Sequence, residues 1–250
     1  MIHFRFVWLI IFTGILFSKC QVPKNNETRD SQEVFPAAFR QSLENIGGLN
    51  NWRNYGTLFF SEVRAQDTIK YTVDLKNRDE RIEKPGHYTV DFIGDSVQIF
   101  PNRDSFAKNP QFYHNLKFYF FALPYVTADP GTIHEDLGSK MFDGKLYDRI
   151  KVTFEDSVGL APKDQYILWF DHQDHLLRLL NYSVTYFDEN NAEKYNAIIY
   201  DGWKGFDGLK FPTQLTGYIW EADTLGAQRY QSLFTDISLS TDRKLNRSSD

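Results

Sequence analysis

Residues 108–125 read KNPQFYHNLKFYFFALPY, and this stretch decides how the rest of the chain can fold. Pro110 suits a first helical turn, and Pro124 ends the run because proline cannot continue a helix. Between the prolines, apolar residues recur at helical spacing, at Phe112, Tyr113, Leu116, Phe120 and Leu123. The spacing predicts one helix over 109–123.

This predicted helix is apolar on nearly every side, which favours burial on more than one face. Burying each large side chain contributes about 2–3 kcal/mol, so Phe112, Leu116, Phe120 and Leu123 are expected to hold the helix in place. The other rings exceed what one helix face can bury, and together they could line a groove for an apolar ligand. The candidate ligand-binding residues are therefore Phe112, Leu116, Phe118, Tyr119, Phe120, Phe121 and Tyr125.

Most of the remaining sequence alternates with period two and is rich in Thr, Tyr, Phe, Val and Ile, which is typical of strands. The strand candidates are 57–63, 68–76, 87–93, 96–100, 147–155, 165–170, 176–187, 194–203, 209–220 and 229–239. Turn signals such as Asp143-Gly144 and Asp207-Gly208 separate them. Local connections of this kind indicate an antiparallel meander and not alternating βαβ units.

A second helix is predicted from VFPAAFRQSLENIGG, residues 34–48, where apolar residues recur every three or four positions and Gly47 supplies a stop. We therefore predict a mainly β (α+β) fold, a strongly curved antiparallel half barrel of about 10–11 strands. Its concave face would carry the two helices, with an apolar groove between helices and sheet.

The N-terminal segment has the composition of an export signal, since an apolar run over 6–17 follows His3 and Arg5. Cys20, the only cysteine, ends this segment and resembles the acylated cysteine of a bacterial lipoprotein, although Phe17 and Lys19 depart from the usual lipoprotein pattern. An ordinary cleaved signal and an uncleaved anchor remain alternatives. With a single cysteine, no disulfide framework is possible.

The domain boundaries follow from these composition changes. We predict a signal peptide over 1–20, a flexible tether over 21–33, one curved β domain over 34–240 and a disordered tail over 241–250.

Neither charge nor motifs point to a reaction. The formal net charge is −5 and no basic stretch is interleaved with aromatic residues, which argues against nucleic acid as a partner. The histidines of DHQDHLL (171–177) are expected at a hairpin tip on opposite faces, and HEDLG (134–138) lacks the spacing of a zinc protease. His114 is expected to be a core imidazole with one hydrogen-bond partner. We predict no catalytic residue, no metal site and no cofactor.

Several segments resemble a known fold family. IGGLNNWRNYGTLFFSE (46–62), DQYILWFDHQDHLLRLLNYSV (164–184) and DGWKGFDGLKFPTQLTGY (201–218) resemble the periplasmic lipoprotein carriers LolA and LolB. NPQFYHNLKFYFFALPYVTADPGTIHEDL (109–137) is similar to an uncharacterised family of Gram-negative, flavobacteria-like lipoproteins. The resemblance covers roughly 35–239 and implies a curved sheet with helices in its hollow that shelters acyl chains.

These observations together predict a non-enzymatic, monomeric lipoprotein that binds a lipid or another apolar ligand. The lipid on Cys20 would anchor it in the envelope of a Gram-negative bacterium, facing the periplasm or the cell surface. Two alternatives remain open: a scaffold or interaction lipoprotein with a filled interior, and a hydrolase acting on envelope material.

Overall fold

The computed structural model describes residues 35–156 and 159–245. The predicted signal peptide with Cys20, the tether over 21–33 and the last residues of the predicted tail, 246–250, lie outside the described residues.

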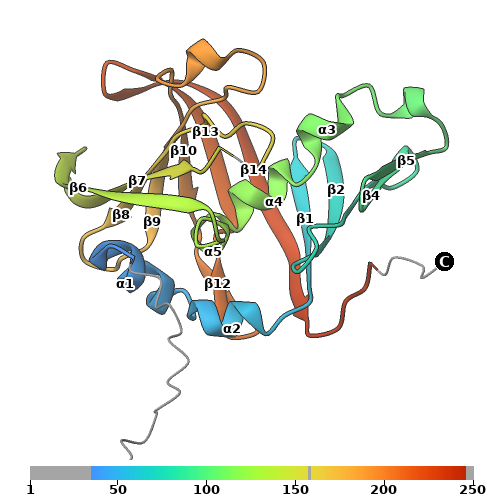
Figure 1. Ribbon diagram of the computed structural model, residues 1–250, viewed down its shortest axis with the longest axis horizontal. Coiled ribbons are helices and arrows are strands. Elements are labelled where there is room, and N and C mark those ends of the chain that lie inside the picture. The colour runs from blue at the N-terminus through green and yellow to red at the C-terminus, as the bar shows by residue number, and fades with distance from the viewer. Residues whose placement is uncertain (1–34, 157–158, 246–250) are drawn as a thin grey trace, which may run out of the picture. The chain divides into compact units, whose positions relative to one another are not determined.

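One antiparallel sheet dominates the fold (Figure 1). Its twelve strands run in the order β5-β4-β3-β2-β1-β14-β13-β10-β9-β8-β7-β6, and β11 and β12 form a separate small sheet. The strands are β1 Thr57–Arg64, β2 Asp67–Asp74, β3 Glu80–Lys84, β4 Tyr88–Ile93, β5 Ser96–Phe100, β6 Thr132–Phe142, β7 Lys145–Phe154, β8 Tyr166–Asp171, β9 Leu177–Tyr182, β10 Asn196–Asp201, β11 Lys204–Phe206, β12 Leu209–Phe211, β13 Gln214–Glu221 and β14 Thr224–Ser240. The predicted mainly β, antiparallel fold is confirmed.

The sheet consists of two meanders joined side by side. β1 to β5 form the first, β6 to β10 continue through β13 and β14 into the second, and β14 pairs with β1 at the junction. The connection from β5 to β6 must therefore pass from one edge of the sheet to the other. Helices α3 to α5 lie in that connection and cross one face of the sheet (Figure 1).

The predicted helix over 109–123 is wrong as a single element. The structure has three short helices there: α3 Pro110–Tyr113, α4 Leu116–Phe121 and α5 Leu123–Val126. The first break occurs because Asn115 has φ +58°, a left-handed conformation that an α-helix cannot contain. Pro124 does not end the run as predicted, since it occupies the first turn of α5, where its missing N–H costs nothing.

The helix predicted within residues 34–48 is confirmed as α1 Ala37–Asn45, which buries Phe39 and Leu43. Gly47 follows it with φ +114°, and a Cβ there would lie 2.3 Å from the carbonyl oxygen of Gly208, so only glycine fits. A further helix, α2 Leu49–Arg53, follows directly and was not predicted.

The sequence also missed three strands. β3 reads ERIEK and β11 reads KGF, so neither shows a clear apolar alternation. β6 contains the polar run HED (134–136), which hides any strand pattern in the sequence, but it is an edge strand with exposed charges.

The main core lies between the helices and the sheet. Phe121 of α4 stacks on Phe60 of β1 and Phe234 of β14, with ring centroids 4.5 and 4.6 Å apart. Trp52 of α2 stacks on Tyr125 of α5 at 4.7 Å. A second, smaller cluster contains Tyr147, Trp169, Leu179 and Ala197. Many of the aromatic side chains therefore pack the short helices onto the sheet.

Five residues of the predicted tail, 241–245, pack against the domain. Arg243 donates from Nε to the Asp74 carboxylate at 2.6 Å, and the backbone N–H of Lys244 donates to the Thr57 hydroxyl at 3.0 Å. Leu245 is buried. The ordered domain therefore extends at least to Leu245.

Candidate ligand-binding site on the concave face

Three of the predicted ligand-binding residues belong to the protein's own core. Phe118, Phe121 and Tyr125 have no exposed surface. Phe121 is enclosed by the rings of β1 and β14, and the Tyr125 hydroxyl donates to the carbonyl oxygen of Ile46. Their rings are therefore in contact with protein side chains already, and contact with a ligand stays a prediction for them.

The other four predicted residues remain partly accessible. Phe112, Leu116 and Phe120 are half-buried, and Tyr119 is 38% exposed. Phe112 extends the aromatic surface toward the β9–β10 loop, where its ring lies 5.2 Å from that of Tyr186 and 4.8 Å from that of Phe187.

Phe120 ties α4 to the sheet. Its ring meets Tyr182 of β9 edge to face at 4.9 Å. Its carbonyl oxygen accepts a hydrogen bond of 2.9 Å from the hydroxyl of Tyr200 on β10. Because the Tyr200 ring is buried, this bond fixes the distance between α4 and the sheet, and the half-buried part of the Phe120 ring keeps a defined position.

Tyr230 of β14 continues this wall on the sheet side. Its ladder partner on β13 is Gly217, and a Cβ on Gly217 would stand 2.2 Å from the Tyr230 ring. The missing side chain lets the ring lie across β13, where burial and the neighbouring Tyr182 raise the Tyr230 pKa. Half-buried Tyr230, buried Tyr182 and half-buried Phe120 thus form a continuous aromatic strip from β14 to α4.

A buried ion pair lies beneath this strip. Glu62 of β1 is almost fully buried and accepts from the Lys117 ammonium at 2.8 Å, from the Ser232 hydroxyl at 2.6 Å and from the Tyr71 hydroxyl at 3.3 Å. Burial raises the pKa of Glu62, but Lys117 and the hydrogen bonds outweigh that effect and hold the pKa below its usual value. Lys117 therefore attaches α4 to β1, as the Tyr200 hydroxyl attaches it to β10.

A second buried carboxyl supports the break between α3 and α4. Glu80 of β3 has no exposed surface and accepts from the Asn115 backbone N–H at 2.6 Å. Burial raises the Glu80 pKa to about 8, although this hydrogen bond opposes the rise, so the group is mostly protonated at neutral pH.

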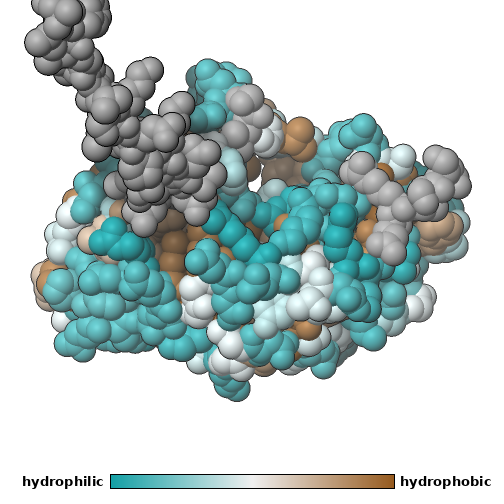
Figure 2. Space-filling view, turned by 60° about the horizontal axis from the view of Figure 1, so that its bottom comes forward, coloured by the Kyte–Doolittle hydropathy of each residue, from teal (hydrophilic) through white to brown (hydrophobic). Residues whose placement is uncertain are grey.

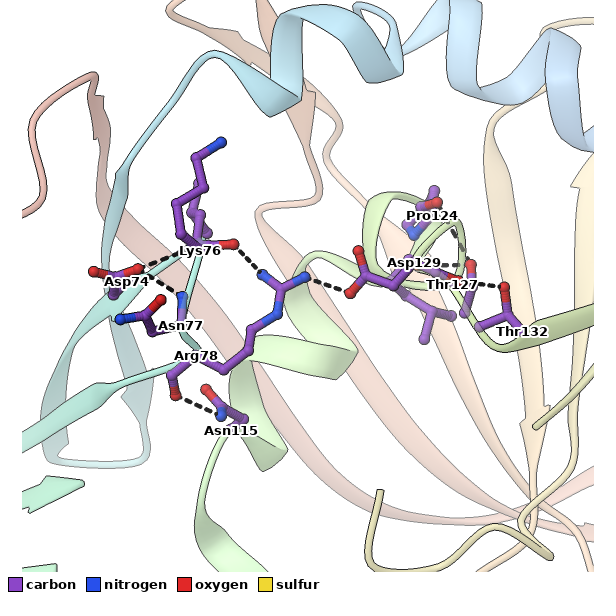
Figure 3. Close-up of polar contacts among 11 residues, drawn as sticks. Asp74, Lys76, Asn77, Arg78, Asn115, Pro124, Thr127, Asp129 and Thr132 are labelled. Atoms are coloured by element: carbon purple, nitrogen blue, oxygen red, sulfur yellow. Dashed lines mark hydrogen bonds and ion pairs between the residues drawn. The ribbon is translucent and has the colours of Figure 1, made fainter. Parts of the chain in front are cut away.

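The backbone carbonyl oxygen of Arg78 contacts the other polar groups at this break. The Asn115 side-chain amide donates to this oxygen at 2.9 Å (Figure 3), and His114 Nε2 lies 2.9 Å from it. The His114 ring also stacks on Phe92 at 4.5 Å. These contacts agree with the core role predicted for His114.

The Arg78 guanidinium links the β2–β3 loop to the start of β6. It donates to the carbonyl oxygen of Leu75 at 3.0 Å and to the carboxylate of Asp129 (Figure 3). A surface cavity of about 340 Å³ lies beside this pair. It is lined by Trp52, Arg53, Leu75, Lys76, Arg78, Asp129 and Pro130.

A second polar cavity, of about 520 Å³, lies between the end of α1 and the β8–β9 turn. Its lining includes Asn45, His175 and Lys210, and Lys210 donates to the Asn45 amide oxygen at 2.9 Å. Neither cavity has the mostly apolar lining that an acyl chain requires.

The remaining histidine candidates contact other groups of the protein. β8 and β9 form the predicted hairpin, and His172 at its tip lies 2.9 Å from the Asp148 carboxylate. His134 packs its ring between Phe35 and Phe39 and contacts the carbonyl oxygen of Thr127. In residues 35–156 and 159–245 no group of three or more histidine, cysteine or acidic side chains could hold a metal ion.

The face of the molecule drawn in Figure 2 is largely hydrophilic, and hydrophobic residues appear on it in recesses and at scattered places along the edges. Within the described ranges, no helix has the length and apolar character needed to span a bilayer.

Sequence reasoning missed the sheet side of this site. Glu62, Tyr230 and Ser232 were part of strand patterns and carried no signal of their own. Ser232 is 170 positions from Glu62, so only the pairing of the first and last strands brings them together.

Comparison with solved structures gives distant similarities. A LolA superfamily protein from Nitrosomonas europaea is 11% identical, with 82% of this chain and 93% of that chain covered and a TM-score of 0.47. A DUF1329 family protein from Desulfovibrio piger is 10% identical over 84% and 94%, with a TM-score of 0.46. A putative outer membrane lipoprotein-sorting protein domain from Vibrio parahaemolyticus is 9% identical over 83% and 95%, with a TM-score of 0.42.

No curated protein matches the chain. One family model does, over residues 50–198, which include β1 to β9, α3 to α5 and part of β10. The protein therefore belongs to a family of unknown function, DUF6503.

Proposed function

We propose that this protein is a non-enzymatic envelope lipoprotein that binds the apolar chain of a lipid in a groove between the sheet and α3–α4. The observation that carries this proposal is the aromatic strip of Tyr230, Tyr182 and Phe120, whose two ends are half-buried, together with the half-buried Phe112 on α3. A contiguous set of accessible rings marks a ligand or partner site more often than single exposed apolar residues do.

Binding would occur by burial alone. Each CH₂ group moved from water into such a groove contributes about 0.8 kcal/mol. The Tyr200 hydroxyl attaches α4 to β10 and the Lys117 ammonium attaches it to β1, so the groove would be formed before the ligand arrives and little ordering would be needed on binding.

The predicted acylation of Cys20 would place this groove close to a membrane. A tether over 21–33 would let the domain reach lipids near its own anchor, either on the periplasmic side or at the cell surface. The intact mass of the mature N-terminus tests this part directly, because an acylated Cys20 differs in mass from an ordinary cleaved end.

Native mass spectrometry of protein purified from membranes tests the binding proposal. We expect bound lipid, and displacement of the fluorescent fatty acid cis-parinaric acid by that lipid. Phe120→Ser is expected to reduce the binding of this probe strongly. Phe100→Ser is the matched control, since Phe100 is 50% exposed on the edge strand β5, away from the strip. Wild-type protein that neither carries lipid nor binds the probe would refute the proposal.

A second candidate, an interaction or scaffold lipoprotein, is favoured by one observation. The rings of three core residues, Phe118, Phe121 and Tyr125, are fully buried between the helices and the sheet. They therefore occupy space that a large ligand would need there. In that case Phe112 and the 68% exposed Phe187 would contact a protein partner. Capture of a defined partner that Phe187→Ser abolishes, with no bound lipid, would support this candidate.

A further inference from the structure

Basic side chains gather where the aromatic strip approaches the β1–β2 hairpin. Arg64 ends β1, with its guanidinium carbon 4.6 Å from the centre of the Tyr230 ring. Lys117 Nζ lies 5.5 Å from the centre of the same ring. Lys108 precedes α3, with Nζ 4.4 Å from the centre of the Tyr113 ring. Cations in these positions are attracted to the ring faces, so their head groups have defined places.

The acids of this region already have partners. Glu62 is paired with Lys117, and Asp67 lies 2.8 Å from Lys84. Arg64 and Lys108 differ from these residues, because no ion pair joins either of them to an acid within the described ranges.

Lys108 keeps exposed surface, and its ammonium lies against the Tyr113 ring. Partial desolvation lowers its pKa, and the nearby Arg64 and Lys84 lower it further, while Glu62 and Asp67 act in the opposite direction. An ammonium under these conditions would gain from an anion beside it. Arg64 covers Tyr230, which begins the strip, and its effect on the Lys108 pKa shows that the two cations lie near each other.

We propose that the ligand of this groove is an amphiphile with an anionic end, a carboxylate or a phosphate, which Arg64 and Lys108 bind while the apolar chain lies along Tyr230, Tyr182 and Phe120. This inference rests on the proposed function and adds the chemistry of the ligand's polar end. A guanidinium and an ammonium both form charge-assisted hydrogen bonds with such oxygens. The buried Glu62 does not repel the anion, because Lys117 and Ser232 already satisfy its carboxylate.

A pair of probes that differ only in charge tests the inference. Dodecanoate and dodecanol have the same chain, and calorimetry measures their affinity for the folded protein. We expect wild-type protein to bind dodecanoate more tightly, and the double variant Arg64→Gln/Lys108→Gln to lose about tenfold in dodecanoate affinity while its dodecanol affinity stays unchanged. The charge preference should also weaken as salt is added.

The control is Lys145→Gln/Lys204→Gln, which removes the same charge from exposed positions on β7 and β11. We expect it to bind both probes as the wild type does. Equal binding of dodecanoate and dodecanol by the wild type, or equal losses for both in the double variant, would overturn this inference but leave apolar binding intact. Failure of both probes to bind the wild type would instead refute the proposed function.

Discussion

The ring of Tyr230 occupies the space in which Gly217 has no side chain. The two residues are paired across β13 and β14, and a Cβ on Gly217 would come within 2.2 Å of the ring. The direction of the Tyr230 side chain, and with it the start of the aromatic strip, therefore depends on a glycine in the neighbouring strand.

Gly217→Ala should displace the Tyr230 ring. Because a methyl group cannot fit at 2.2 Å from the ring, we expect a loss of about 1–3 kcal/mol in the free energy of unfolding and weaker binding of cis-parinaric acid. Urea unfolding and probe titration measure the two effects. Gly205→Ala is the control, since nothing lies within 4 Å of a Cβ at Gly205. Unchanged probe binding in folded Gly217→Ala protein would contradict the role given to Tyr230.

Lys117→Met should destabilise the protein by about 3–5 kcal/mol, because it leaves the buried Glu62 carboxylate without its cation. The wild-type Glu62 pKa is held below 4.5, so its contribution to stability is present above pH 4.5 and is lost as the pH falls through the folded pKa.

In Lys117→Met the Glu62 pKa should rise above 4.5, so this variant should become less stable as the pH increases, the reverse of the wild-type trend. Adding Glu62→Gln should remove most of the penalty. Urea unfolding between pH 3 and pH 8, about the range over which carboxyls titrate, measures both trends. A full 3–5 kcal/mol loss that persists in the double variant would show that Lys117 acts mainly through packing.

Glu80→Gln should reduce the loss of stability that the wild type undergoes as the pH rises from 4.5 to 8. The folded Glu80 pKa of about 8 lies above its ordinary value of 4.5, so its contribution is fully present below pH 4.5 and is lost as the pH rises toward 8. The slope is about 1.4 kcal/mol per pH unit for one proton.

Glutamine mimics the protonated carboxyl and does not titrate, so Glu80→Gln should match the wild type near pH 4.5 and exceed it in stability at pH 8. Thermal unfolding at both values is the measurement. Parallel stability curves for the two proteins would show that Glu80 has an ordinary pKa.

Asn115→Gly and Asn115→Ala should separate two contributions of the helix break. Both variants lose the amide donor to the Arg78 carbonyl oxygen, but only glycine adopts φ +58° without strain. We expect Asn115→Ala to be less stable than Asn115→Gly by about 1 kcal/mol. Equal stabilities by urea unfolding would mean that the break moves to another residue.

The sequence supports the fold class well, and the structure shows why. Helix α1 was predicted because Phe39, Leu43 and Gly47 give an uninterrupted periodic signal with a stop. Strands with a clear apolar alternation, such as β1, were found for the same reason, whereas β6 and β11 were missed although a tight turn follows each of them. Charged strands such as β3 were not found, since their stability comes from neighbours that a local pattern does not contain.

The helical connection shows where local periodicity fails. Asparagine adopts the left-handed region more readily than most residues, but an asparagine alone does not signal a break inside a run with helical spacing. At Asn115 this conformation is held by contacts with Glu80 and Arg78, more than thirty positions away. The break rotates α4, so Phe118 and Phe121 are buried where Leu116 and Phe120 were expected to be. The sequence therefore did not divide the seven predicted residues between buried core and accessible surface, and their contact with a ligand stays a prediction.

The pairing of β14 with β1 bears on the order in which the protein can be made. During synthesis the first meander emerges with the edge of β1 unpaired until residues 224–240 follow. The Glu62 carboxylate likewise lacks the hydroxyl of Ser232 until then. A nascent chain halted before β14 would present the unpaired edges of β1 and β13 to other chains, so a chaperone that shields β1 would raise the yield.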